Sequence, residues 1–101
     1  IREENLFLYD FQVRIFNERR QDILQAIIAL REEIKPDIIF MPSLQDIHQD
    51  HNVISLEGIR AFKFNTILSY EMPWNNFNFA TTSFMLLSEE HINIKIVIEK
   101  V

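Results

Sequence analysis

The stretch that decides the fold runs over residues 35–62 and reads KPDIIFMPSLQDIHQDHNVISLEGIRAF. Its residues 37–41 (DIIFM) form a continuous apolar run, which is typical of a strand buried on both faces of a parallel sheet. Pro42 is expected to end this strand, and residues 43–51 to form a polar loop. Residues 52–63 are expected to form a helix, because Val53, Leu56, Ile59 and Phe62 recur on one face.

Similar elements lie on both sides of this stretch. Residues 17–34 predict a helix that Asn17 caps and that Lys35-Pro36 ends. Residues 6–11 (LFLYDF), 66–72 (TILSYEM) and 81–87 (TTSFMLL) predict further strands. A helix is expected from about Ser88, although the alternation of isoleucines over residues 92–98 also fits a strand.

Strand, helix, strand, helix, strand is the order of right-handed βαβ units. We therefore expect one α/β domain over residues 1–101, a Rossmann-like parallel sheet with helices on both faces that is incomplete in this chain. Ligands of such sheets bind beyond the carboxyl ends of the strands. The loops after Met41 and Met72 lie at those ends.

Composition excludes several classes of protein. The net charge of −5 argues against nucleic acid and anionic membrane surfaces as partners. The chain has no cysteine, which excludes disulfides, thiol catalysis and cysteine-based zinc sites and fits a reducing, cytoplasmic location. No apolar run reaches the roughly 18 residues of a membrane span.

Residues 46–51 (DIHQDH) bring together two imidazoles and two carboxylates. His48 and His51 are three residues apart, so a helical turn would place them in one site. The residues alone leave other roles open, because Asp50 could cap the following helix and Asp46 could be a turn residue. Two histidines are also an incomplete zinc site, since a catalytic zinc ion normally has three protein ligands.

The motif His48-Gln49-Asp50-His51, in its strand-loop-helix setting, resembles the H-x-D-H motif of the PIG-L/LmbE-like family of zinc-dependent N-acetylglucosaminyl deacetylases. The segments LFLYDF, ILSYEMPWN and LSEEHIN are also similar to bacterial members, so the resemblance covers nearly the whole chain. It implies that His51 is a zinc ligand. It further implies that His48 stabilises the oxyanion and protonates the leaving amine, and that Asp50 orients His48.

The resemblance implies zinc, or another divalent metal, as the cofactor and an N-acetylated amino sugar or glycoconjugate as the substrate. The family's second motif, Ala-His-Pro-Asp-Asp, supplies two more ligands and the general base, and it is absent from this sequence. We therefore expect the chain to be an internal part of a deacetylase domain. Alone, it is expected to be inactive and to self-associate as a homo-oligomer or pair with a covering segment. The alternative is a non-catalytic α/β interaction domain whose HQDH loop binds no metal.

Weaker candidates follow the strand of residues 66–72. Glu71, Trp74 and Asn75 are expected on the ligand side of the sheet, where an aromatic ring and amide groups could hold a sugar. A Trp that covers the loop or joins the core is the competing interpretation. His91 is expected to be solvated.

Overall fold

The computed structural model describes residues 2–99. Its elements are, in order, the 3-10 turns η1 (Glu3–Asn5) and η2 (Phe16–Glu18), helix α1 (Arg20–Ile34), strand β1 (Ile38–Pro42), helix α2 (Gln49–Ala61), strand β2 (Thr66–Tyr70) and helix α3 (Glu89–Glu99). The mixed α/β fold that the sequence predicts is confirmed. Within the described residues no helix is both long and apolar enough to cross a membrane.

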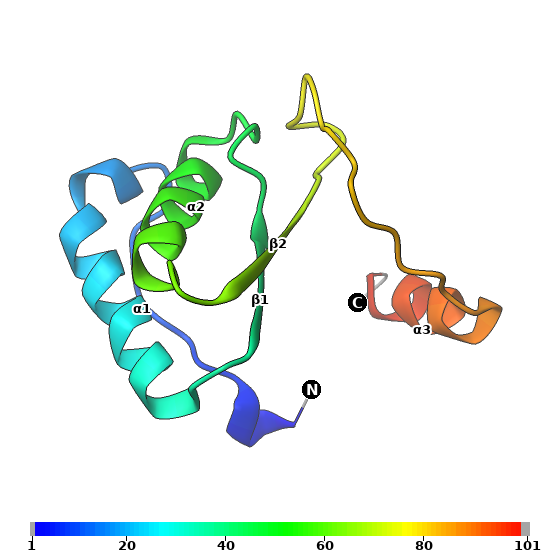
Figure 1. Ribbon diagram of the computed structural model, residues 1–101, viewed down its shortest axis with the longest axis horizontal. Helices are drawn as coiled ribbons and strands as arrows, with labels where there is room; N and C mark the ends of the chain where they lie inside the picture. The colour runs from blue at the N-terminus through cyan, green and yellow to red at the C-terminus, as the bar shows by residue number, and fades with distance from the viewer. Residues whose placement is uncertain (1, 100–101) are drawn as a thin grey trace.

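Strands β1 and β2 pair in parallel, with Ile38 opposite Thr66 and Pro42 opposite Tyr70. Helix α2 connects them as a βαβ crossover, and α1 packs on α2 (Figure 1). The core cluster is formed by Leu24, Ala61 and Phe62, against which Ile39 and Ile67 pack from the strands. Both packed helices therefore cover the same face of the sheet, and the expected helices on both faces are not found among the described residues.

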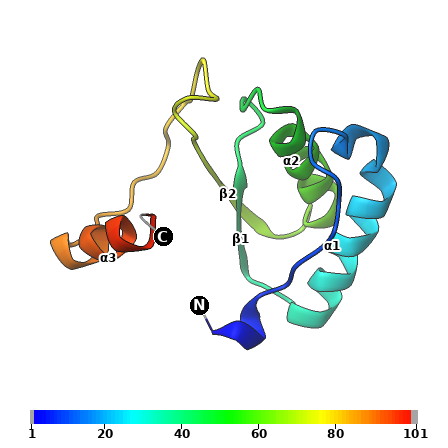
Figure 2. The same cartoon turned by 180° about the vertical axis from the view of Figure 1, so that it is seen from behind.

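The opposite face of the sheet is open. Ile38 is 53% exposed and Phe40 is 56% exposed, so β1 is not buried on both faces as its apolar run predicted. Helix α3 stands on this side but apart from the sheet, at the end of an extended segment (Figures 1 and 2). Its start at Glu89, directly after Ser88, confirms the helix that the sequence favoured over a strand.

Two expected strands are absent from the described residues. Residues 6–11 and 81–87 have no ladder partner, and Leu8 and Phe84 are 82% and 89% exposed. Apolar composition favours an extended backbone, but a strand also needs the N–H and C=O groups of a neighbour. These two predictions were wrong because the required partner strand is not present beside them.

Helix boundaries also differ from the sequence predictions. Asn17 lies in η2, and α1 begins only at Arg20, without a side-chain cap. Its end is as expected, with Lys35 in the left-handed conformation (φ 51°) before Pro36. Glycine is the usual residue in this conformation, but the chain has a single glycine, Gly58, and uses Lys35 here.

Gly58 is used where α2 crosses β1. A Cβ atom placed there would lie 3.0 Å from Cε of Met41 and 3.2 Å from its Sδ. Nearby, the buried hydroxyl of Ser55 donates to the carbonyl oxygen of Pro42 at 2.7 Å. These contacts bring the helix close to the strand and fix its position along it.

A buried carboxylate joins the two packed helices. The side chain of Glu57 is fully buried; Arg20 of α1 donates to its Oε1 and Arg60 of α2 to its Oε2, each at 2.7 Å. Arg20 itself is about half exposed, so a helix surface residue supplies one of the two partners of this buried charge.

We predict that Arg20→Met lowers the free energy of unfolding by about 1.5–3 kcal/mol. The substitution removes one hydrogen bond to the buried carboxylate of Glu57, which then has Arg60 as its remaining partner. Urea unfolding of the 101-residue chain measures the change. Arg19→Met is the matched control, since its ion pair with Asp22 is more than half exposed, and should cost about 0–1 kcal/mol. Equal losses in the two variants would contradict a structural role for Arg20.

A second prediction concerns the open face of the sheet. The chain exposes 8420 Å², whereas a compact monomer of this mass would expose roughly 6,000 Å². Exposed apolar side chains on an unpaired strand edge promote association. Phe40→Asp should therefore shift the chain toward the monomer in light scattering. Phe64→Asp, at a residue that is 93% exposed in the α2–β2 connection, should not; a wild-type monomer at high concentration would refute the prediction.

Candidate functional site

The histidine motif lies at the carboxyl end of β1, where the chain turns into α2. Helix α2 begins at Gln49, three residues earlier than the sequence predicted, and His48 rather than Asp50 is its N-cap. The Nδ1 atom of His48 accepts a hydrogen bond from the main-chain N–H of Asp50 at 3.1 Å. An imidazole nitrogen thus does what a hydroxyl or carboxylate usually does at this position.

The two histidine rings lie face to face. Their centroids are 4.3 Å apart and their planes differ by 20°. His51 is in the first turn of α2, so the three-residue spacing does bring the rings together as the sequence predicted. His48 is an exposed residue and the side chain of His51 is 30% exposed, so a solute can approach the pair.

A buried carboxylate lies behind the pair. The side chain of Asp46 is fully buried, and its Oδ2 is 2.8 Å from Nδ1 of His51. Its Oδ1 accepts the main-chain N–H of His48 at 2.8 Å. Because an ionised carboxylate only accepts, Nδ1 of His51 is assigned as the donor, and in the neutral ring the lone pair is then on Nε2.

The sequence interpretation of Asp46 as a simple turn residue missed this contact. Asp46 directly follows the turn over residues 44–45, but its carboxylate is used by both histidines. No regular spacing indicates the pair, since Asp46 is in the loop and His51 is five residues later in the helix. Only the angle at which the loop enters α2 brings the two groups together.

The carboxylate of Asp50 is used elsewhere. It is 6% exposed, and its Oδ2 accepts the main-chain N–H of Arg14 at 2.6 Å. Gln49 donates from Nε2 to the carbonyl oxygen of Arg14 at 2.8 Å, and Arg14 has a positive φ of 71°. These bonds fasten the segment before η2 onto the start of α2. Asp50 contacts the His48 ring through its main-chain N–H. The resemblance implies that Asp50 orients this ring, and in the structure the carboxylate of Asp50 bonds to Arg14 instead.

The loop after β2 meets the histidine loop, as expected for the carboxyl ends of neighbouring parallel strands. Asp46 forms an isolated antiparallel bridge with Asn76, and Ile47 donates its N–H to the carbonyl oxygen of Asn75 at 2.8 Å. Asn75 therefore lies beside the site but uses its main chain there. Trp74 is 74% exposed, so it is not a core residue.

Asn76 also lies against the histidine loop, through its bridge to Asp46. Its Oδ1 accepts the main-chain N–H of Met72 at 3.0 Å, which orients the amide, and its buried Nδ2 has no hydrogen-bond partner among the described residues. Glu71 lines a hollow of about 610 Å³ at this edge of the sheet, together with Gln45 and Tyr70. Of the predicted substrate residues, Asn75 is thus placed against the histidine loop and Glu71 in the neighbouring hollow.

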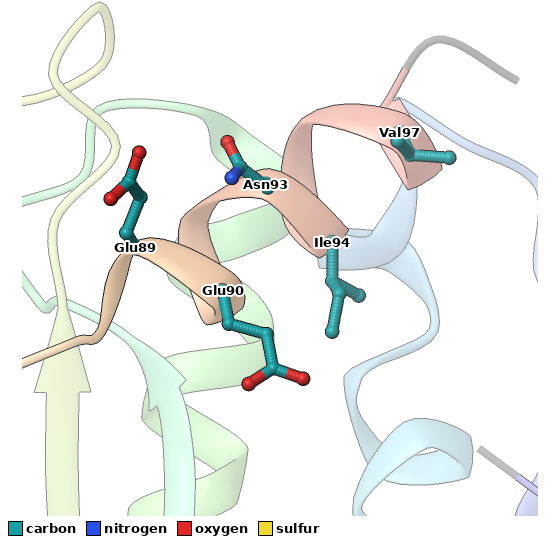
Figure 3. A pocket seen from close by; sticks show the side chains of 5 residues that line it. All are labelled: Glu89, Glu90, Asn93, Ile94 and Val97. Atoms are coloured by element: carbon teal, nitrogen blue, oxygen red, sulfur yellow. The ribbon is translucent and has the colours of Figure 1, made fainter.

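Another hollow, of about 570 Å³, lies on α3 and has different chemistry. It is lined by Glu89, Glu90, Asn93, Ile94 and Val97. Figure 3 shows that its two carboxylates point away from each other, so they do not converge on a ligand. His91, on the same helix, is exposed as predicted and lies 2.9 Å from the hydroxyl of Ser88.

His51 is the residue best suited to hold a metal ion. A metal-binding histidine usually donates its second ring N–H to a carboxylate, which is how His51 contacts Asp46. Residues 2–99 contain no group of three or more His, Cys, Asp or Glu side chains arranged to hold a metal. Within these residues, the structure therefore offers one suitable ligand and its supporting carboxylate.

Comparison with known proteins adds no family to this geometry. No family model, no curated protein and no solved structure matches the chain.

Proposed function

We propose that this chain is part of a zinc-dependent hydrolase that removes an N-acetyl group from an amino sugar or sugar conjugate. The observation that carries the proposal is the stacked pair of histidines. Nδ1 faces a hydrogen-bond acceptor in one ring and a hydrogen-bond donor in the other. Nδ1 of His51 faces a carboxylate, and Nδ1 of His48 faces a main-chain N–H. The neutral rings therefore present a lone pair and an N–H donor side by side.

His51 would contribute one ligand to the metal through Nε2. When bound, zinc supplies the polarisation of the amide carbonyl and the activation of water at neutral pH. The resemblance implies that a His and two Asp residues of an Ala-His-Pro-Asp-Asp motif supply the other ligands and the general base. The proposal therefore requires a further segment that carries them.

His48 is suited to hold the substrate's carbonyl oxygen. Its Nδ1 accepts from Asp50, so the proton of the neutral ring is on Nε2 and can be donated in a hydrogen bond to an oxygen that gains negative charge. The same hydrogen bond does not support proton transfer to the leaving amine, because loss of the Nε2 proton would leave an anionic ring. Of the two roles that the resemblance implies for His48, the oxyanion donor is the better supported.

The loop after β2 would face the sugar. Its contact with the histidine loop through Asn75 and Asn76 brings amide groups and the exposed ring of Trp74 to the same edge of the sheet. Amides can both donate to and accept from hydroxyl groups, and an aromatic ring can pack on the apolar side of a sugar. Glu71 would add an acceptor from the neighbouring hollow.

The second candidate is a non-catalytic α/β interaction domain whose HQDH loop binds no metal. It is favoured by the lack of a three-ligand group among residues 2–99 and by the open apolar face of the sheet. Zinc content of the complete protein separates the two candidates, since only the hydrolase needs a stoichiometric metal.

We predict that His51→Ala abolishes zinc retention in the complete enzyme, because it removes one of three protein ligands. Metal analysis of the purified variant gives the answer. His91→Ala is the matched control, since this exposed histidine belongs to α3, which stands apart from α2 (Figure 1), and the variant should keep its zinc. A His51→Ala variant with wild-type zinc content would rule out His51 as a ligand.

His48→Ala is expected to keep its zinc but to lower kcat by roughly 10²- to 10³-fold, the usual effect of removing an oxyanion donor. Deacetylation kinetics with an N-acetylated amino sugar measure the loss. Asp50→Asn should have a milder or similar effect, because the main-chain N–H that contacts His48 remains. An unchanged kcat in His48→Ala would show that this ring does not contact the reacting group.

A further inference from the structure

Asp46 is the buried acid of the site for which neither the sequence nor the resemblance supplies a role in the chemistry. Its side chain is inaccessible to solvent, and each oxygen has one partner: Nδ1 of His51 at 2.8 Å and the main-chain N–H of His48 at 2.8 Å. A carboxylate is costly to bury, and it is retained in proteins where hydrogen bonds compensate for the lost water. Here both compensating groups belong to the histidine pair.

We propose that Asp46 is a positioning residue that fixes the tautomer of His51, so that Nε2 stays unprotonated and faces outward. The same carboxylate holds the main chain of His48, so one side chain sets the orientation of both histidines. The part of this inference that concerns a metal rests on the proposed function. The part that concerns the tautomer depends only on the hydrogen bonds of Asp46.

The position of Asp46 is itself fixed from two directions. On the β1 side, its main-chain N–H donates to the carbonyl oxygen of Ser43 at 3.1 Å. On the other side, the bridge to Asn76 and the bond from Ile47 to Asn75 hold the loop against the segment after β2. These bonds fix the main chain of Asp46, and the N–H of His48 holds its Oδ1, so the carboxylate has a defined place from which to hold the His51 ring.

A purely structural role would not need a carboxylate. An asparagine has the same shape, and its amide oxygen could accept the N–H of His48 while its NH₂ group donates to Nδ1 of His51. Every hydrogen bond would then be kept, but the His51 proton would move to Nε2. Asp46→Asn therefore separates the two roles, because it preserves the packing and reverses the tautomer.

The experiment uses the 101-residue chain with ¹⁵N-labelled histidine, at about pH 8, where an ordinary histidine is neutral. Two-bond ¹H–¹⁵N correlation spectra identify the tautomer of each ring. We expect His51 to carry its proton on Nδ1 in the wild type and on Nε2 in Asp46→Asn, with His48 on Nε2 in both. Asp10→Asn, at an exposed residue outside the helices and strands, is the matched control and should leave both tautomers unchanged.

Zinc alone is then titrated into the complete protein, which carries the further ligands that the proposed function requires, with and without Asp46→Asn. Loss of the carboxylate partner should weaken zinc binding by about 10- to 100-fold, the usual effect of removing such a partner. An unchanged His51 tautomer in a folded Asp46→Asn variant would overturn the inference, as would a Nε2-protonated His51 in the wild type. If the tautomer switches but the complete wild-type protein binds no zinc, Asp46 is confirmed as the positioning residue and the zinc-dependent function fails instead.

Discussion

The close approach of α2 to β1 is the constraint on which the rest of the structure depends. It is possible because Gly58 has no Cβ to meet Met41, and the hydroxyl of Ser55 ties the helix to the carbonyl oxygen of Pro42. With the helix axis fixed against the strand, only six residues, 43–48, are left to connect the two elements. This short connection contains the turn that buries Asp46, and it places His48 at the N-cap of α2.

Two carboxylates are buried on different sides of α2. Glu57 lies on the side of α2 that meets α1, where two arginines neutralise it, and Asp46 lies under the first turn, where two N–H groups of the histidine pair satisfy it. In both places hydrogen bonds compensate for the water that a buried carboxylate has lost. Stability and site geometry are therefore coupled through one helix.

The sequence predicted the parts of this structure that depend on local pattern. The αβαβ order from α1 to β2, the end of α1 at Lys35 and the meeting of His48 with His51 all follow from apolar periodicity, proline or helical spacing. The predicted strands that needed a further neighbouring strand were wrong. Residues 6–11 and 81–87 have the composition of strands, but no neighbouring strand pairs with them in the described part of the chain.

The start of α2 was misplaced for a related reason. Asp50 is a more usual capping residue than histidine, yet its Oδ2 accepts the N–H of Arg14, 36 residues away in sequence, and its buried Oδ1 has no hydrogen-bond partner among the described residues. The N-cap of α2 is His48 instead, and its Nδ1 accepts the N–H of Asp50 at 3.1 Å. Asp46 could not be predicted either, because its link to His51 crosses from a loop into a helix.

The two histidines show what the sequence cannot specify about a site. Chemically they are identical side chains three residues apart, and composition gives no reason to assign them different tasks. The difference arises at a single atom, Nδ1, which meets a buried carboxylate in His51 and a main-chain donor in His48. Because each neutral ring carries one proton, the partner of Nδ1 decides whether Nε2 is an acceptor or a donor. The fold thus makes one histidine suited to bind a metal and the other suited to donate to an oxyanion. The groups that cause this difference are themselves held in place by the packing of α2 on β1.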